Sequence, residues 1–282
     1  MCQPDQTPRP GSRSPDPSLP IVVVKTGRTY PELQRRRGDF EDWTVRALGM
    51  ESAAVEIVDV EPDPHLPPPR SIAGAVVTGS HSMVTEGQGW VEPLADWLRR
   101  LVQDEVPILG VCYGHQLLGQ TLGGLVGFRP DGPEIGTVAV DLLPAGETDA
   151  LLGGMPKRFR AHTTHAQSIL TLPDGAVLLA RTDHETHAAF RAGSCAWGVQ
   201  FHPEYDQQIM RFYVREQRAT LQAQGRDPDR VEAEVCYADT GRILRRFLAL
   251  VHGSELRKDP LSSERGIIPL GGSGASRGGS SC

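Results

Sequence analysis

Short apolar runs alternate with amphipathic stretches along the first half of the chain. The apolar runs are rich in β-branched residues, as buried parallel strands are, and they predict strands at 21–25, 55–60, 72–78 and 106–111. Apolar residues at helical spacing predict helices at 39–48, 90–103 and 113–122. This alternation predicts an α/β fold, in which an open, mostly parallel, flavodoxin-like sheet has helices on both faces.

The second half of the chain follows a different pattern. Turn residues separate short predicted strands, which suit an antiparallel extension of the sheet, at 135–143, 176–181, 188–191 and 195–201. A helical C-terminal segment is predicted over 207–252, with a break at 225–228. Within it, we interpret 207–236 as a helical insertion that precedes the closing helix at 240–251.

The two ends of the chain differ in composition from its body. Residues 1–19 are rich in Pro, Ser and charge, and residues 259–282 are rich in Gly and Ser, so both are predicted to be disordered tails. The region between them, 20–258, has the length of one domain. Of the 282 residues, 39% are hydrophobic, which is enough to bury a sizeable core.

Charge and cysteine usage narrow the class of protein. The net charge of −6 argues against nucleic acid as the main partner, because phosphate binding needs a basic surface. No apolar run approaches the roughly 18 residues of a membrane span. The cysteines are scattered, odd in number and without a CxxC pair, as in a reducing compartment. Since the first residues also lack a signal-peptide pattern, we expect a cytoplasmic protein.

The residues from Gly110 to Gly114 (GVCYG) form the strongest local motif. They follow an apolar strand and precede a helix, with small residues on both sides of Cys112. This is the pattern of a nucleophile elbow, in which the nucleophile lies on a strained turn that larger flanking side chains would obstruct. The turn also places Cys112 at a helix N-terminus, where the dipole favours thiolate. We therefore predict Cys112 to be a catalytic nucleophile.

A base and an orienting acid are predicted from Phe201–Glu204 (FHPE), which ends a strand. His202 and Glu204 are two residues apart, so in an extended chain their side chains point to the same side. His202 could take the Cys112 proton while Glu204 fixes the imidazole tautomer. For the oxyanion hole, the elbow geometry predicts the Tyr113 N–H, and the small-residue loop at 78–82 offers the Gly79 N–H.

The same motifs resemble the class I glutamine amidotransferase family, over about residues 20–252. The likeness is carried by the segments 110–118 (GVCYGHQLL), 123–124 (GG) and 201–204 (FHPE). It is greatest to the stand-alone bacterial members that are similar to the amidotransferase domain of GMP synthase. The resemblance implies hydrolysis of the glutamine side-chain amide through a Cys–His–Glu triad, with release of ammonia and no cofactor.

Carried over to this sequence, the resemblance implies Cys112, His202 and Glu204 as the triad. It also implies substrate contacts for Gln116, His165 and Ser80. Gln167 stands two residues after His165, where the family often has Asp. No nucleotide-binding motif is found, so an ammonia-accepting synthetase would be a separate chain.

Several alternatives remain open at this point. The same chemistry would serve a free-standing γ-glutamyl peptidase or hydrolase, and a non-catalytic binding module is a third hypothesis. His115 invites a Cys–His dyad, but the elbow geometry favours a packing role for it. The spacings 162/165 and 184/187 of His residues lack further ligands, so no metal is expected. The insertion 207–236 is either a stabilising surface hairpin or a lid or docking surface at the mouth of the active site.

Overall fold

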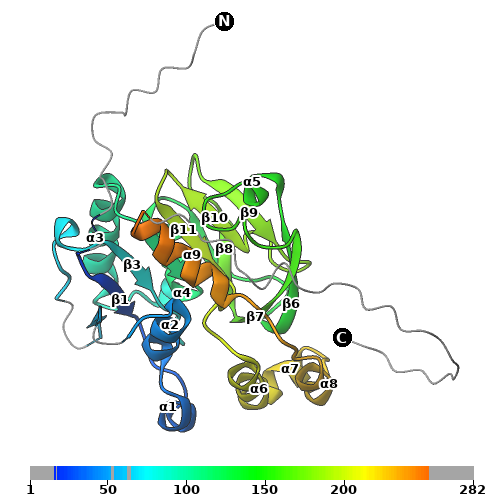
Figure 1. Cartoon of the computed structure of the whole chain (residues 1–282). Coiled ribbons are helices and arrows are strands. Elements are labelled where there is room, and N and C mark those ends of the chain that lie inside the picture. The colour runs from blue at the N-terminus through cyan, green and yellow to red at the C-terminus, as the bar shows by residue number, and fades with distance from the viewer. Residues whose placement is uncertain (1–15, 17, 52–53, 62–64, 254–282) are drawn as a thin grey trace, which may run out of the picture.

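A computed structural model describes residues 16, 18–51, 54–61 and 65–253 of the chain (Figure 1). Its strands are β1 (Ile21–Lys25), β2 (Val55–Asp59), β3 (Gly74–Val77), β4 (Ile108–Val111), β5 (Leu125–Phe128), β6 (Glu134–Leu142), β7 (Arg158–His165), β8 (Gln167–Thr171), β9 (Val177–Arg181), β10 (Ala189–Ala192) and β11 (Ala196–Val199). Its α-helices are α1 (Pro31–Arg37), α2 (Phe40–Leu48), α3 (Val91–Gln103), α4 (Tyr113–Thr121), α5 (Pro144–Glu147), α6 (Gln207–Glu216), α7 (Arg218–Ala223), α8 (Pro228–Ala233) and α9 (Gly241–Val251). Two short 3₁₀-helices in the described residues are η2 (Pro69–Ser71) and η3 (Val84–Glu86).

The described strands form one large and one small sheet. The large sheet has nine described strands in the order β2-β1-β3-β4-β11-β10-β9-β6-β7, and β5 pairs with β8 in the small one. Strands β2 to β11 in this order are parallel, whereas β10, β9, β6 and β7 continue the sheet in antiparallel pairing. The predicted parallel α/β sheet with an antiparallel extension is therefore confirmed.

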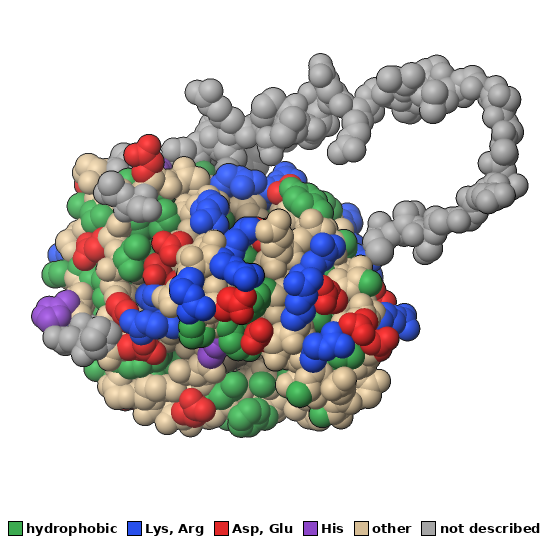
Figure 2. Space-filling view, turned by 90° about the horizontal axis from the view of Figure 1, so that it is seen from below, with side chains coloured by type: hydrophobic (Ala, Val, Ile, Leu, Met, Phe, Trp, Pro, Cys, Tyr) green, Lys and Arg blue, Asp and Glu red, His purple; other side chains and the backbone are tan. Residues whose placement is uncertain are grey.

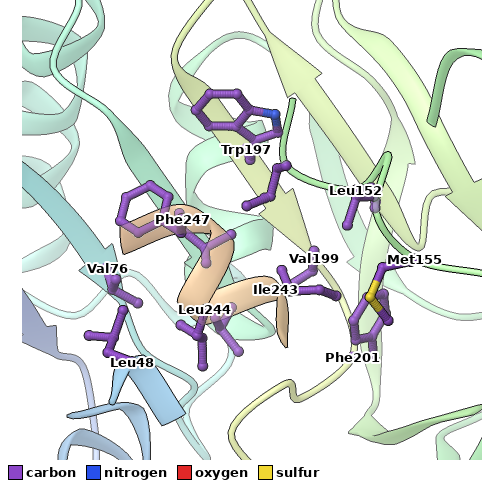
Figure 3. Close-up of a cluster of buried hydrophobic side chains, with 14 of the residues drawn as sticks. Leu48, Val76, Leu152, Met155, Trp197, Val199, Phe201, Ile243, Leu244 and Phe247 are labelled. Carbon is purple, nitrogen blue, oxygen red and sulfur yellow. The ribbon is translucent and has the colours of Figure 1, made fainter. Parts of the chain in front are cut away.

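Helices cover both faces of the parallel strands. On one face, α9 packs its apolar side chains Ile243, Leu244 and Phe247 against the sheet and α2 (Figure 3). On the other face, α3 and α4 bury side chains such as Leu98 and Leu118. Each such burial stabilises the fold by roughly 1.5–3 kcal/mol. The two layers of helices thus fix the carboxyl ends of β3, β4 and β11, where parallel strands present functional groups.

Local sequence signals set several element boundaries. Asp39 caps α2, because its carboxylate accepts from the Phe40 N–H at 2.9 Å while the Asp39 N–H donates to Asp42. Gly49 ends the same helix in the left-handed region, with φ 76°. Asp227 caps α8, which has Pro228 as its first residue, as the sequence predicted.

Some elements differ from the prediction. Helix α1 and strands β5, β7 and β8 were not predicted, because they are short or, like edge strand β7 (RFRAHTTH), too polar to show an apolar run. The helix expected to continue through the insertion breaks at Gln217, where φ is −103° and ψ is 22°, and divides into α6 and α7. None of the described helices is both long and apolar enough to cross a bilayer.

The expected tail 259–282 lies outside the described residues. The expected tail 1–19 lies outside them too, apart from Asp16, Ser18 and Leu19. The division into two tails and one domain over 20–258 therefore stays a prediction.

Candidate active site

Cys112 occupies the turn between β4 and α4. Its backbone has φ 51° and ψ −100°, a strained conformation for a residue with a side chain. The Cys112 N–H donates to the Val199 carbonyl at 2.9 Å, which ties the turn to the end of β11. Because α4 starts at the next residue, the thiol lies at a helix N-terminus. The strand, turn and helix predicted around Cys112 are all present.

The glycines on each side of Cys112 are required by close backbone contacts. A Cβ on Gly110 would lie 2.4 Å from the Gly114 carbonyl oxygen. A Cβ on Gly114 would lie 2.4 Å from the Val77 carbonyl oxygen on β3. Real Cβ atoms do not approach backbone oxygens so closely, so only glycine lets α4 pack this tightly against β3 and β4.

His202 and Glu204 form a buried pair just after β11. The His202 Nδ1 donates to the Glu204 carboxylate at 2.8 Å, and the two side chains are 2% and 1% exposed. The His202 backbone N–H donates to the His162 carbonyl at 2.8 Å, which fixes the chain next to β7. The other ring nitrogen, Nε2, is buried and has no hydrogen-bond partner among the described residues. One nitrogen of His202 is therefore oriented and the other is open.

The surroundings of His202 favour its charged form. Burial lowers the pKa of His202, but the Glu204 carboxylate and then Cys112 raise it by more, so the net pKa lies well above its ordinary value of 6.5. An imidazolium at this position can stabilise a neighbouring thiolate, as in a Cys–His pair.

Two aromatic rings hold the imidazole plane. Tyr205 is fully buried and stacks on His202 with ring centroids 4.0 Å apart and an interplanar angle of 18°. Phe40 lies nearly parallel to the same ring at 6.4 Å. These contacts restrict rotation of the ring, so that Nε2 keeps one direction.

Backbone donors are available near the thiol. Among the described residues, neither the Gly79 nor the Tyr113 N–H has a hydrogen-bond acceptor. The Thr26 hydroxyl contacts the carbonyls of Thr78 and Gly79 at 3.1 Å each and holds this loop in place. A Cβ on Gly79 would lie 3.0 Å from His202 Cε1, so the loop passes directly beside the imidazole. Free amides in this position could bind a developing oxyanion.

A cavity of about 350 Å³ opens onto Cys112 and His202. Of the other predicted site residues, Ser80, Tyr113, Gln116 and His165 line it, whereas Gly79 and Glu204 lie behind the lining. Its volume is at the small end of the range for ligand pockets. The described lining residues include no Asp, Glu, Lys or Arg, so recognition there would depend on neutral donors and acceptors and on histidine.

The two side chains predicted to contact substrate on the far side of the cavity are already bonded within the protein. The Gln116 Nε2 donates to the Gln167 carbonyl at 2.6 Å and to the Gln200 side-chain oxygen at 3.0 Å. Its own side-chain oxygen remains as an acceptor. Ser80 is less constrained, since its hydroxyl accepts only from the Ser82 N–H at 3.0 Å.

His165 has both ring nitrogens occupied. Nδ1 lies 2.8 Å from the Gln167 carbonyl and Nε2 lies 3.1 Å from the Glu134 carboxylate. Burial raises the pKa of Glu134, but the bond and charge of His165 lower it by more, so that it falls below its ordinary value. Since both partners of the ring are acceptors, both nitrogens donate, and none is left for a ligand. His165 therefore contributes its ring surface to the cavity rather than a hydrogen bond.

Sequence reasoning missed several residues of the cavity. Tyr205 follows the His-Pro-Glu motif directly, and an aromatic residue beside a candidate base was the signal that could have identified it. Tyr213 was assigned only to the buried face of a helix, and Gln217 was not singled out, yet both line the cavity with Cys112. Their contribution depends on how the insertion packs, which the sequence alone does not give.

The remaining candidates lie elsewhere in the fold. His115 is fully buried against Phe190, with ring centroids 5.1 Å apart, and burial lowers its pKa to about 3. It packs in the core, as the elbow geometry predicted. Within the described part of the chain, no group of three or more His, Cys, Asp and Glu side chains is arranged to hold a metal ion.

Comparison with known families now decides the relationship. The family model described as Glutamine amidotransferase class-I matches residues 38–216, which include the elbow and the His-Pro-Glu motif. The chain belongs to the class I glutamine amidotransferase family. The resemblance inferred from the sequence motifs is confirmed.

Curated relatives of this class I amidotransferase are of two kinds. It is 35% identical over 184 residues to "GMP synthase [glutamine-hydrolyzing]" of Aeropyrum pernix, covering 65% of this chain and 32% of that protein. It is 31% identical over 189 residues to a separate subunit of the glutamine-hydrolysing GMP synthase of Methanococcoides burtonii, covering 66% and 87%. It is also 30% identical over 143 residues to "Gamma-glutamyl peptidase 5" of Arabidopsis thaliana, covering 49% and 55%. The match thus spans about a third of the first relative's length and most of the second's.

A solved structure confirms the fold of this amidotransferase. A glutamine amidotransferase from Thermotoga maritima superposes with a TM-score of 0.66 at 20% sequence identity, covering 83% of this chain and 99% of that one. At this identity the likeness establishes the architecture only.

Proposed function

We propose that this class I amidotransferase hydrolyses the side-chain amide of glutamine to glutamate and ammonia. The observation that carries the proposal is the open Nε2 of a buried, carboxylate-oriented His202 at the same small cavity as a strained, helix-terminal Cys112. Family membership supplies the reaction class, and the geometry supplies a nucleophile and a base.

In the first step, the Cys112 thiolate attacks the γ-carbonyl carbon of glutamine. A C–S bond forms, and the oxygen takes up the negative charge, which the Gly79 and Tyr113 amides are positioned to stabilise. The C–N bond then breaks, and the amide nitrogen takes the proton held by His202 and leaves as ammonia. Removing one such amide donor typically costs about 10²–10³-fold in rate.

In the second step, neutral His202 takes a proton from water, and the resulting hydroxide attacks the γ-glutamyl thioester. The C–S bond breaks, glutamate leaves, and the imidazolium and thiolate are restored. Glu204 stays ionised throughout and stabilises the imidazolium through its 2.8 Å hydrogen bond to Nδ1.

Substrate recognition in this proposal uses neutral groups. The Gln116 side-chain oxygen and the buried, unpartnered Gln167 Oε1 are acceptors on the cavity side opposite His202, suited to the substrate's amino group. Ser80 offers a hydroxyl beside the Gly79 loop. His165 fixes the Gln167 carbonyl and so shapes this side of the cavity without bonding to the substrate.

A separate synthetase is the proposed acceptor of the ammonia. The chain covers 87% of a protein named as a subunit of GMP synthase, but only 32% of a longer GMP synthase. Both the acceptor and the cytoplasmic location expected from the cysteine pattern stay predictions. The second candidate function is hydrolysis of γ-glutamyl peptides, which the 30% identity to a γ-glutamyl peptidase favours.

The test is a direct assay of ammonia release from glutamine, run beside γ-glutamyl dipeptides. We expect ammonia and glutamate in equal amounts, and Cys112→Ser, with the same turn but a much less acidic nucleophile, should lose the activity. Hydrolysis of dipeptides but not of glutamine would favour the second candidate. Activity retained by Cys112→Ser would refute the proposed nucleophile.

A further inference from the structure

Three side chains of the insertion lie in the wall of the cavity that holds Cys112. They are Tyr213, Gln217 and Thr220, from α6 and the start of α7. The family match ends at residue 216, within this segment. We call residues 207–224 the α6–α7 wall.

The inner side chains of the α6–α7 wall are fixed at both edges of the cavity. The Tyr213 hydroxyl lies 2.9 Å from the Thr29 hydroxyl and 2.9 Å from His81 Nε2. The Gln217 amide donates to the Thr164 hydroxyl at 2.7 Å. The Thr164 carbonyl in turn lies 3.8 Å from the Cys112 sulfur. The wall is therefore anchored next to the thiol.

The rest of the segment packs as a rigid body rather than as a lid. Its apolar side chains form a buried cluster with Phe40 and Tyr205, and those contributed by the wall are Ile209, Met210, Tyr213, Val214 and Leu221. The Gln224 amide donates to the Pro133 carbonyl at 2.7 Å, just beyond the cavity. A lid would have to break this cluster each time it opened, which argues for a fixed wall.

The outer surface of the segment shows no comparable apolar face. Figure 2 views the molecule from the side of α1, α6, α7 and α8 and shows basic and acidic side chains mixed over it. Arg215 pairs with Glu232, and Arg218 pairs with Asp229 at 2.7 Å. The distinctive chemistry of the α6–α7 wall therefore lies on its inner side.

Contacts between rings place Tyr213 on the His202 side of the cavity. Tyr205 stacks on His202 at 4.0 Å, and Tyr213 packs on Tyr205 at 5.2 Å and on His81 at 5.6 Å. Gln116 and His165 instead meet at the Gln167 carbonyl on β8. The leaving group of the proposed reaction must lie beside His202, because that ring gives it a proton. Tyr213 and His81 therefore border the space for the leaving group.

From this arrangement we propose that the α6–α7 wall restricts the leaving group to ammonia, with Tyr213 as the main specificity-determining residue. This rests on the proposed function and deepens it. For glutamine, the C–N bond breaks and the nitrogen leaves as ammonia with the His202 proton. For a γ-glutamyl amide of a larger amine, the same bond breaks, but the amine carries a substituent that would occupy the space bordered by Tyr213 and His81.

The first test compares kcat/KM for glutamine with kcat/KM for γ-glutamyl anilide. Wild-type protein should favour glutamine, and Tyr213→Ala should shift the ratio toward the anilide by about 10-fold or more. Tyr213→Phe keeps the ring and should leave the ratio nearly unchanged. Arg215→Ala, on the exposed side of the same helix, is the matched control. Equal use of both substrates by wild-type protein, or an unchanged ratio in Tyr213→Ala, would overturn the proposal.

A second test needs no turnover and so separates this proposal from the proposed function. Alkylation of Cys112 by iodoacetamide and by iodoacetanilide is followed by peptide mapping, with each rate divided by that of a free thiol. Wild-type protein should favour the small reagent, and Tyr213→Ala should reduce that preference. If Tyr213→Ala does not fold, Gln217→Ala at the rim should show a smaller change in the same direction. No size preference in wild-type protein would refute the wall, whatever the outcome with glutamine.

Discussion

Two buried histidine–glutamate pairs lie at the same cavity, and they are similar in most respects. His202 meets Glu204 at 2.8 Å, and His165 meets Glu134 at 3.1 Å. All four side chains are 5% exposed or less. Both histidines line the cavity. A search for buried His–carboxylate pairs would not tell them apart.

The difference lies in the second ring nitrogen. In His165 it donates to the Gln167 carbonyl at 2.8 Å, so the ring is fully bonded. In His202 it has no partner among the described residues, and Cys112 influences its charge. A carboxylate partner orients both rings, but only an open nitrogen can exchange protons with a thiol, water or a leaving group. The comparison teaches that the free nitrogen, rather than the pair, marks the proposed base.

The two pairs are also built differently by the chain. His202 and Glu204 are two residues apart in one extended segment, so the local sequence creates the pair. Glu134 and His165 are directly opposite each other in the register of β6 and β7. The second pair therefore depends on the sheet, and it helps to hold the antiparallel extension against the cavity.

Replacing each histidine by asparagine should separate the two roles most strongly. His202→Asn removes the base and should lower kcat by about 10⁴-fold, since triad members act as a unit. His165→Asn should keep kcat within about 10-fold while lowering the midpoint of thermal unfolding, because it leaves Glu134 buried without its partner. Steady-state kinetics and thermal melts measure both. Similar losses of kcat in the two variants would contradict the comparison.

Replacing the orienting acid should change both rate and pH dependence. In Glu204→Gln the largest influence that raises the pKa of His202 is lost, while burial still lowers it. The imidazolium should then lose its proton at lower pH, so the alkaline limb of kcat/KM should move to lower pH. We expect kcat at neutral pH to fall by about 10–1,000-fold, less than for triads that depend fully on the acid. An unchanged pH–rate profile would remove Glu204 from the proposed triad.

The matching substitution in the other pair should affect stability rather than rate. Glu134→Gln should cost about 1–3 kcal/mol of unfolding free energy and change kcat by less than about 3-fold. The folded pKa of Glu134 lies below its ordinary 4.5, so its contribution is present above that pH and is lost as pH falls through the folded pKa. The stability gap between wild type and variant, measured by denaturant unfolding, should therefore shrink below pH 4.5. A gap that stayed constant with pH would contradict this role.

The sequence predicted the first pair and the elbow because each is local. Gly110, Cys112 and Gly114 lie in one turn, and His202 and Glu204 in one extended segment, so spacing alone implies their geometry. The parallel strands were equally visible, since burial on both faces makes them continuous apolar runs.

The second pair and the α6–α7 wall could not be predicted in the same way. Strand β7, which carries His165, is a polar edge strand without an apolar run. The position of Tyr213 at the cavity depends on packing between the insertion and Phe40, which lies far away in sequence. Contacts of this kind are set by tertiary structure rather than by local pattern.

The central claim is that Cys112, next to the open nitrogen of His202, is the nucleophile toward glutamine. Its most direct test is mass-spectrometric mapping of the adduct formed by a glutamine analogue that carries a chloromethyl ketone at the γ-position. We predict one adduct, on Cys112, that excess glutamine prevents from forming, with no label on the other free cysteines of the described chain, Cys195 and Cys236. An adduct on Cys195 or Cys236 with Cys112 unmodified would contradict the account.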